Sequence, residues 1–435
     1  MADFQSTVEE QGPVRRVLTV TVPPERVAGE FDRAYRRLGG RVRVPGFRKG
    51  KVPRRVLEMR FGEEVREEVV TELIETTCAD AIKAEGLDVV SRPRLIQHEL
   101  DEQTGLRFEA MVDVRPQFEL KPYKGLAADL RVVRVEEEDV DRALAALRER
   151  YAMLETEEDR VNVSMGDVVV ADLAAFCDGE PLEQATGQGV QIEVGAGRFP
   201  EELEKQLVGV TRGIETPILV RFEQDHPDPA LAGKLVRFDV TVREIKNKIL
   251  PALDDEFAAE VGIEGCDTLE ALRAKVREDL ERRERMEAER RMRNDLLSAL
   301  VEAHDFEVPE TLVDQQLVRM LRDMGVREIP DDKVAEVRAA LEPSAVKQVR
   351  AGFILDAIAQ AEGLEVTEDE LRDAIKRQFV AAGSQVDAVR SHYERPGAVA
   401  ALRQDMLRDK ALDRVVELAT QRDVEVDRSQ VADTR

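Results

Sequence analysis

The spacing of apolar and polar residues divides the first third of the chain into short strands and helices. Partial alternation predicts a strand near the N-terminus, and two prolines after it open a helix that we expect to end at Gly39 and Gly40. The predicted order is strand, helix, short helix, longer helix, strand and strand, over residues 13–22, about 25–38, 53–62, about 63–84, 88–98 and 106–115. Residues 1–115 are therefore expected to form an α+β domain.

The next two regions differ in the spacing of their apolar residues. Residues 116–151 begin as an extended connector and end in a helix over about 137–150, where apolar residues recur at helical spacing. Residues 152–248 consist of β-branched runs separated by glycine and proline turns, interrupted by one helical piece over about 200–208. This pattern predicts a small β-rich domain.

Residues 249–435 are predicted to be almost entirely helical. Asp267 with Glu270 and Thr367 with Glu370 have the spacing of capping boxes at helix starts. Few aromatic residues are available for one compact core, so we expect an extended all-α domain, with a frayed polar tail over 421–435. The fold class is thus α+β multidomain.

Charge and cysteine content narrow the classes of function. The 435 residues carry a net charge of −25, which disfavours nonspecific binding of nucleic acid by the whole molecule. The three cysteines are far apart and form no CxxC pair, which is typical of a reduced, cytoplasmic protein. No apolar stretch is long enough to span a membrane. No His, Cys or carboxylate grouping has metal-ligand spacing, so no metal or cofactor is expected.

One basic segment stands out against the acidic chain. Residues 33–60 contain eleven Lys or Arg and one acid, Glu58. The centre of this segment predicts an exposed loop with an apolar tip, flanked by cations that suit phosphates or carboxylates. Its residues are Gly46, Phe47, Arg48, Lys49, Gly50, Lys51 and Pro53. Two alternatives stay open: the loop is merely solvated, or Phe47 folds under it into the core.

The motif Gly-Phe-Arg-Lys-Gly-Lys-Val-Pro over 46–53 resembles the ribosome-docking signature of the trigger factor family. The order of elements and the phrases VPETLVDQQL, GFILDAIAQAEGLEVTEDEL and DKALDRVVELA extend the resemblance over nearly the whole chain. The resemblance implies a chaperone that binds nascent and unfolded polypeptides at the ribosomal tunnel exit, delays misfolding and assists folding and export. Its partners would be the exit-tunnel protein and rRNA of the large ribosomal subunit, and free subunits can form a homodimer in such a family.

The resemblance also assigns a role to each region. Residues 1–115 would bind the ribosome, 116–151 would connect, 152–248 would be an FKBP-like peptidyl-prolyl isomerase domain, and 249–435 would bind substrates. An FKBP-like isomerase needs no cofactor, because an apolar aromatic pocket binds the twisted X–Pro amide better than the planar one. The candidate pocket residues are Leu173, Leu182, Leu203, Phe222, His226 and Phe238.

Several of these positions depart from the family's aromatic pattern. Leu173, Leu182 and Leu203 stand where aromatic or motif residues are expected, and residues 152–248 contain four Phe, no Tyr and no Trp. Leucine fills volume but supplies no aromatic wall, so we expect weak or absent isomerase activity. The opposing interpretation is that other residues rebuild the pocket.

Two other classes of function explain less of the chain. A stand-alone isomerase would need neither the basic loop nor the helical region, and its pocket should be intact. A nucleic-acid-binding protein would explain residues 33–60 but neither the acidic remainder nor the scarcity of stacking aromatics.

Overall fold

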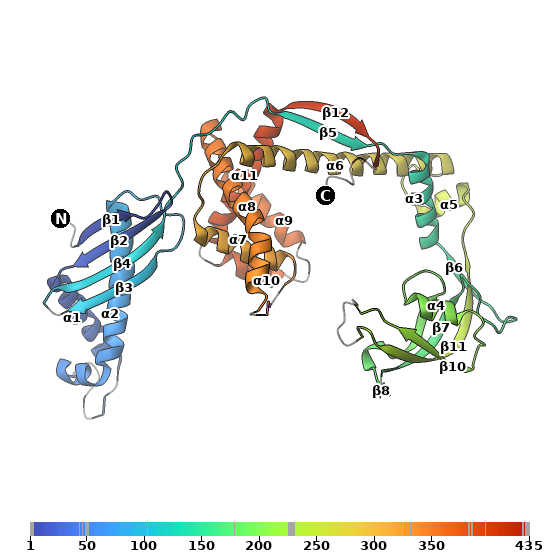
Figure 1. Cartoon of the computed structure of the whole chain (residues 1–435), viewed down its shortest axis with the longest axis horizontal. Coiled ribbons are helices and arrows are strands. Elements are labelled where there is room, and N and C mark those ends of the chain that lie inside the picture. The colour runs from blue at the N-terminus through green and yellow to red at the C-terminus, as the bar shows by residue number, and fades with distance from the viewer. Residues whose placement is uncertain are drawn as a thin grey trace. The chain divides into compact units, whose positions relative to one another are not determined.

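Helices and strands are mixed along the chain, which confirms the expected multidomain α+β class (Figure 1). The computed structural model describes residues 4–42, 44–45, 47, 52–101, 103–177, 179–224, 231–326, 328–330, 332–381, 383, 386–395, 397–428 and 430. The chain forms two compact units. The first is Met1–Leu130 with Glu289–Val424, and the second is Arg131–Ala288 with Glu425–Arg435.

An antiparallel four-stranded sheet with two helices forms the N-terminal region. Its strand order is β1-β2-β4-β3. The elements are β1 (Gln5–Glu10), β2 (Arg15–Val22), α1 (Pro24–Arg41), α2 (Arg54–Ala84), β3 (Arg94–Asp101) and β4 (Gly105–Asp113). Alternate residues of β2 and β4, among them Leu18, Val20 and Phe108, pack with Val69 and Leu73 of α2 in one core. The period-two pattern of the strands and the apolar face of α2 thus meet as a two-layer region.

Helix α1 does not end at the predicted pair of glycines. It continues through Gly39 and Gly40 to Arg41, and the N–H of Val42 donates to Leu38 O at 2.9 Å. A Cβ on Gly39 would lie 3.3 Å from Leu57 Cδ1, so glycine allows α1 and α2 to approach closely. Packing of two helices therefore overrides the local signal for a helix end. The break predicted at Gly62 lies one residue earlier in α2, at Phe61, where φ is −131° and ψ is 16°.

A small antiparallel sheet holds the six strands of the middle region. The path is β10-β11-β7-β8, with β9 beside β7 and β6 beside β11. The elements are β6 (Met153–Thr156), β7 (Val168–Cys177), β8 (Glu180–Pro181), η1 (Glu183–Ala185), β9 (Gly187–Glu193), α4 (Glu201–Leu207), β10 (Glu215–Arg221) and β11 (Leu235–Ile249). The predicted helical piece is α4, and its Leu203 and Leu207 are fully buried against the sheet.

The remaining described elements are mostly helical. They are β5 (Ala127–Val133), α3 (Glu137–Arg150), α5 (Asp255–Val261), α6 (Leu269–Ala303), α7 (Glu310–Asp323), α8 (Val334–Glu362), α9 (Glu368–Ala381), α10 (Val386–Tyr393), α11 (Ala398–Leu418) and β12 (Thr420–Val426). Val140 and Leu144 of α3 pack with Phe257 of α5 and Leu272 of α6. Another core joins the end of α6 to α8 and α11.

Two details correct the expectations for this region. The polar tail is not frayed over 420–426, because β12 pairs with β5 and Thr420 N donates to Leu126 O at 2.8 Å. At the start of α6, Thr268 caps in place of Asp267, since its Oγ1 accepts from Ala271 N at 3.2 Å. The box formed by Thr367 and Glu370 is present, with hydrogen bonds in both directions.

Aromatic and polar contacts fix the connector on the helical core. Phe118 stacks on Phe306 with ring centroids 4.2 Å apart. Buried His304 accepts from Lys121 N through Nε2 at 2.8 Å, and its Nδ1 lies 2.7 Å from Leu300 O. The connector is therefore held by side chains that the sequence did not single out.

A hydroxyl–carboxylate pair completes this attachment. Buried Tyr123 donates its hydroxyl to Glu362 at 2.6 Å, and Lys124 and Arg414 contact the same carboxylate. Hydrogen bonds from Lys124, Tyr123 and Arg414 lower the pKa of Glu362 to about 2. Burial, together with the Glu362 hydrogen bond, raises the pKa of Tyr123 to about 12. Tyr123 therefore stays protonated and Glu362 stays ionised over a wide pH range.

Candidate functional site

The candidate docking loop lies between α1 and α2. Phe47 is 42% exposed, and its N–H donates to Val44 O at 3.1 Å in a turn. Val44 is buried in the core and Pro53 caps the start of α2, so both ends of the loop are fixed. The alternative in which Phe47 is a core side chain is therefore wrong. The other predicted members, Gly46, Arg48, Lys49, Gly50 and Lys51, lie outside the described residues.

Part of the basic segment is neutralised within its own domain. Arg33 pairs with Glu30, Arg37 pairs with Glu68 and Glu72, and Arg54 pairs with Asp32 and Glu58. Glu72, through its hydrogen bond and its charge, raises the pKa of Arg37. A count of charges within 33–60 misses these partners, because most of the acids come from outside that window.

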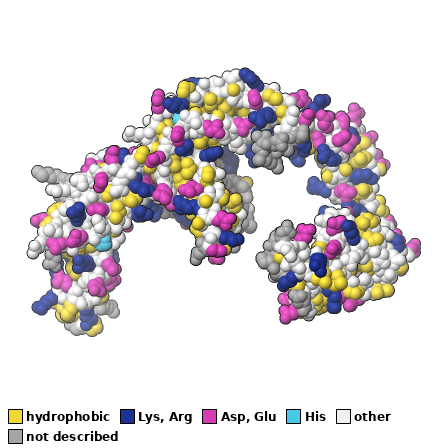
Figure 2. Space-filling model, in the orientation of Figure 1, with side chains coloured by type: hydrophobic (Ala, Val, Ile, Leu, Met, Phe, Trp, Pro, Cys, Tyr) yellow, Lys and Arg dark blue, Asp and Glu magenta, His cyan; other side chains and the backbone are white. Residues whose placement is uncertain are grey.

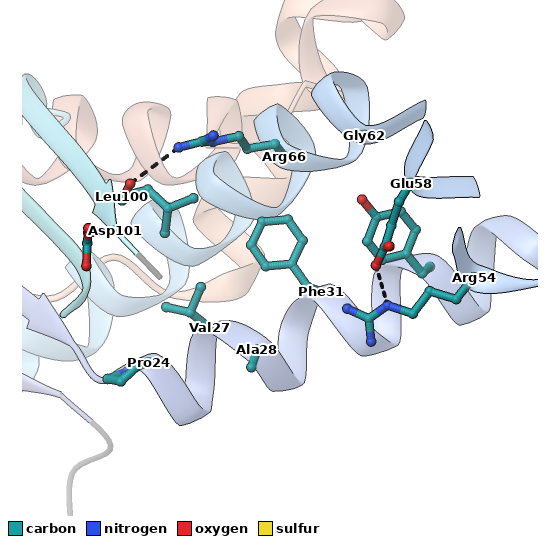
Figure 3. A pocket seen from close by; sticks show the side chains of 11 residues that line it. Pro24, Val27, Ala28, Phe31, Arg54, Glu58, Gly62, Arg66, Leu100 and Asp101 are labelled. Carbon is teal, nitrogen blue, oxygen red and sulfur yellow. Dashed lines mark hydrogen bonds and ion pairs between the residues drawn. The ribbon is translucent and has the colours of Figure 1, made fainter. Parts of the chain in front are cut away.

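A groove of about 520 Å³ lies beside the root of the loop (Figure 3). Val27, Phe31 and Leu100 give it apolar walls, and Arg54 and Arg66 also line it. Arg54 donates to Glu58 at 2.6 Å and lies 5.3 Å from the centroid of the Tyr35 ring. Arg66 donates to Leu100 O at 3.3 Å. Burial raises the pKa of Tyr35, so its hydroxyl stays protonated in the groove.

Five candidate pocket residues of the middle region lie in one apolar cluster. Leu173, Leu203 and Phe238 are buried members, and Leu182 and Phe222 pack against them partly exposed. The sixth candidate, His226, lies outside the described residues. Phe199 also packs against the cluster, and sequence reasoning missed it. The fold thus brings the predicted positions together, with leucine at three of them.

Asp172, next to Leu173, is occupied by structural contacts. It accepts from Gly189 N at 2.9 Å and from Arg243 Nε at 2.8 Å. The Gly189 hydrogen bond and then the Arg243 contact lower the pKa of Asp172. An ionised carboxylate with these partners orders the β7–β9 edge and is unsuited to proton transfer.

A buried carboxylate shapes the loop that carries Phe199. Glu204 of α4 accepts from the backbone N–H groups of Gly195, Gly197 and Phe199 at 2.9, 3.0 and 2.9 Å. Burial alone would raise the pKa of Glu204, but these hydrogen bonds outweigh it and the pKa is lowered. The loop conformation therefore depends on an ionised glutamate.

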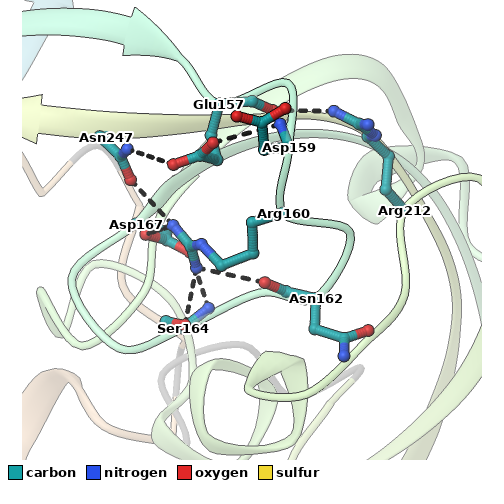
Figure 4. Close-up of polar contacts among 8 residues, drawn as sticks. All are labelled: Glu157, Asp159, Arg160, Asn162, Ser164, Asp167, Arg212 and Asn247. Atoms are coloured by element: carbon teal, nitrogen blue, oxygen red, sulfur yellow. Dashed lines mark hydrogen bonds and ion pairs between the residues drawn. The ribbon is translucent and has the colours of Figure 1, made fainter.

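A polar cluster lies at one end of the middle sheet, where β7 begins and β11 nears its end (Figure 4). Arg160 donates to Asp167 at 2.5 and 2.7 Å and to Asn247 Oδ1 at 2.8 Å, and Asn247 donates to Glu157 at 2.7 Å. Burial opposes ionisation of Asp167, yet Arg160 and the Ser164 N–H lower its pKa. The cluster ties the segment before β7 to the end of β11.

Large apolar side chains are exposed among charges in the helical region. Figure 2 shows hydrophobic side chains interspersed with both signs of charge on the visible face. The exposed residues on these helices include Met286, Val318, Val334, Val380 and Val399, and exposed Met324 directly follows α7. Met292, by contrast, is buried. The methionines among them are flexible and can adapt to apolar partners of different shape.

The described residues contain no group of three or more His, Cys, Asp or Glu that could hold a metal ion. No helix within that part of the chain is long and apolar enough to cross a membrane.

Comparison with known proteins gives full-length matches. The family model described as bacterial trigger factor protein matches residues 4–147, and that of the trigger factor C-terminus matches residues 268–417. Trigger factor of Anaeromyxobacter dehalogenans is 36% identical over 95% of this chain and 98% of its own. Trigger factor of Geobacillus kaustophilus is 36% identical over 92% and 96%. A solved structure of a trigger factor chaperone covers 95% of this chain and 99% of its own, with a TM-score of 0.50 and 24% identity.

An α+β region, a connector, a small sheet and a long helical region follow one another along the chain, and its relatives identify it as a multidomain chaperone. The two family models match the regions on either side of the small sheet, the Anaeromyxobacter dehalogenans relative covers 95% of the chain, and together they confirm the resemblance found in the sequence. The chain belongs to the trigger factor family.

Proposed function

We propose that this chaperone docks at the tunnel exit of the large ribosomal subunit through its basic loop and receives nascent polypeptides there. The exposure of Phe47 in a turn, at the centre of a basic segment, carries the proposal. An apolar tip flanked by cations complements a surface of rRNA phosphate and protein carboxylate. The acidic remainder of the chain is repelled by the same surface, which favours docking through the loop alone.

The four predicted regions take distinct roles in this proposal. Residues 1–115 bind the ribosome, 116–151 connect, 152–248 form the FKBP-like domain, and 249–435 hold unfolded segments on exposed apolar side chains. The exposed Met286 and Met324 support the last role, because the unbranched methionine side chain adapts to partners of different shape.

Co-sedimentation with 70S ribosomes tests the docking role. The variant Phe47→Ala/Arg48→Ala/Lys49→Ala removes one exposed apolar side chain and two cations. We expect its affinity to fall about tenfold or more, because central apolar and charged contacts dominate such interfaces. The matched control is Arg92→Ala/Arg94→Ala/Leu95→Ala, since these residues are exposed and Leu95 is also 42% accessible. Equal binding by both variants would remove the basis for the docking role.

For the middle region we propose weak isomerase activity or none. Leu173, Leu182 and Leu203 supply no aromatic wall, and the ring-bearing residues of the cluster are phenylalanines. A protease-coupled proline isomerisation assay of the full chain tests this. Turnover equal to that of a family member with an aromatic pocket would show that other residues rebuild the site.

A further inference from the structure

The short strand β6 extends the small sheet as a narrow ribbon. Its register with β11 runs from Thr156 opposite Lys246 to Met153 opposite Ile249. Strand β7 reaches along β11 only as far as Lys246. Figure 1 shows β6 along the end of β11 that extends past the other strands. In the part of the chain that the structure describes, β6 pairs with β11 alone, so its second edge has no partner strand.

The alternation of hydrogen bonds between β6 and β11 shows which backbone groups of β6 point toward its open edge. Glu157 N donates to Ile245 O at 2.8 Å, which makes residues 157 and 245 a hydrogen-bonded pair. In an antiparallel ladder such pairs alternate, so Met153 and Glu155 also direct their backbone groups toward β11. The N–H and C=O groups of Leu154 and Thr156 therefore point away from β11, along the open edge.

The side chains of the ribbon are unusually apolar for an open edge. Met153 is 68% exposed, and Leu154 and Ile249 are each 43% exposed. Natural edge strands are generally protected by charge or by a covering element, because an exposed apolar edge is a template for another strand. Here the cations nearby are already paired: Lys246 with Glu244, and Lys248 with Glu149 and Glu193.

We propose that the open edge of β6 binds an extended, apolar segment of an unfolded polypeptide by strand addition. This inference rests on the chaperone function proposed above and assigns one site to it. An extended segment offers N–H and C=O groups that match those of Leu154 and Thr156, and its apolar side chains cover Met153 and Leu154. Exposed Glu155 has no ion pair among the described residues, so a segment with a flanking Lys or Arg fits best.

Site-resolved hydrogen–deuterium exchange of the full chain tests this directly. The probe is a fluorescein-labelled decapeptide that alternates valine and threonine and ends in lysine. With about nine tenths of the sites filled, we expect exchange at the Leu154 and Thr156 amides to slow about tenfold, with no change at Met153 and Glu155. Binding of the peptide without this alternating protection would overturn the ribbon site and leave the chaperone function standing.

A substitution at the edge gives a second readout by fluorescence anisotropy. Leu154→Pro removes an outward N–H but no ladder hydrogen bond, so it suits an edge strand. We expect it to weaken peptide binding about fivefold, as for one lost hydrogen bond, while Leu154→Val binds as the wild type does. Equal affinity of Leu154→Pro and Leu154→Val would overturn the proposal.

Two further measurements separate other outcomes. If the two outward amides are protected in the free protein and lose that protection on dilution, a second copy occupies the edge and the proposal is wrong. The chaperone function itself is tested by asking whether the wild-type chain suppresses the aggregation of a denatured protein. Failure in that assay would count against the proposed function, whereas failure of exchange protection alone counts against the ribbon.

Discussion

The N-terminal region and the middle sheet hold their candidate functional residues in opposite ways. In the first, Phe47 lies exposed in a turn whose ends are fixed by Val44 and Pro53. In the second, Leu173, Leu203 and Phe238 belong to the hydrophobic core itself. A loop residue is free to change with its partner at little cost in stability. A buried cluster is constrained by packing, so a change of side-chain volume at Leu173, Leu203 or Phe238 is felt by the whole core.

The largest expected effect is on the stability of the middle region. Leu203→Ala empties a fully buried position and should lower the free energy of unfolding by about 2–5 kcal/mol. Differential scanning calorimetry of the full chain measures this, with the exposed-site variant Leu95→Ala as control. A loss below about 1 kcal/mol would show that the site collapses around the cavity, and the contrast between the regions would weaken.

Glu204→Gln should destabilise the same region by about 1–3 kcal/mol at neutral pH, because three backbone N–H groups lose a charged acceptor. The folded-state pKa of Glu204 is lowered, so its contribution is fully present above the unfolded pKa of about 4.3 and is lost as pH falls through the folded pKa. The difference between variant and wild type should therefore shrink in acid. Exposed Glu201→Gln is the control, and equal behaviour at pH 7 would contradict the prediction.

Leu182→Phe tests whether the pocket is limited by its missing aromatic walls. Leu182 packs against the core while partly exposed, so a larger ring has room to extend outward. We expect proline isomerisation to accelerate up to about tenfold, since an aromatic contact contributes about 1 kcal/mol. Leu219→Phe, on the exposed face of β10, is the control. No gain over that control would locate the deficiency elsewhere in the cluster.

The smallest effect on stability is expected for the docking loop. Phe47→Ala should change the free energy of unfolding by less than about 0.5 kcal/mol, because the side chain is exposed and lies outside the core. Calorimetry measures the stability, and co-sedimentation of the same preparation measures ribosome binding. A large loss of stability would mean that the two regions do not differ in the way described here.

Local patterns predicted the long, periodic elements well. Helix α3 follows from apolar spacing, and helices α4 and α7 each begin directly after a proline. Local patterns failed where a contact with a residue far away in the sequence decides the structure. Gly39 stays helical because Leu57 packs against it, and β12 forms because β5 lies beside it. Neither partner is visible in a short window of sequence.

The candidate sites show the same limit. The glycine-flanked Phe47 was predicted to be exposed and is exposed. The positive charge of the basic segment was overestimated, because Glu68, Glu72 and Asp32 form ion pairs with its arginines. The roles of Glu204 and Phe199 were missed, since nothing in their local sequence indicates burial or a shared loop.

The pairing of Met153 with Ile249 means that the chain enters and leaves the small sheet at adjacent points. Replacing residues 154–248 with a tight turn would close a hairpin between α3 and α5 without rerouting the backbone. The insert is therefore a detachable module. Loss or exchange of this insert would leave the parts that flank it with their sequence and their path.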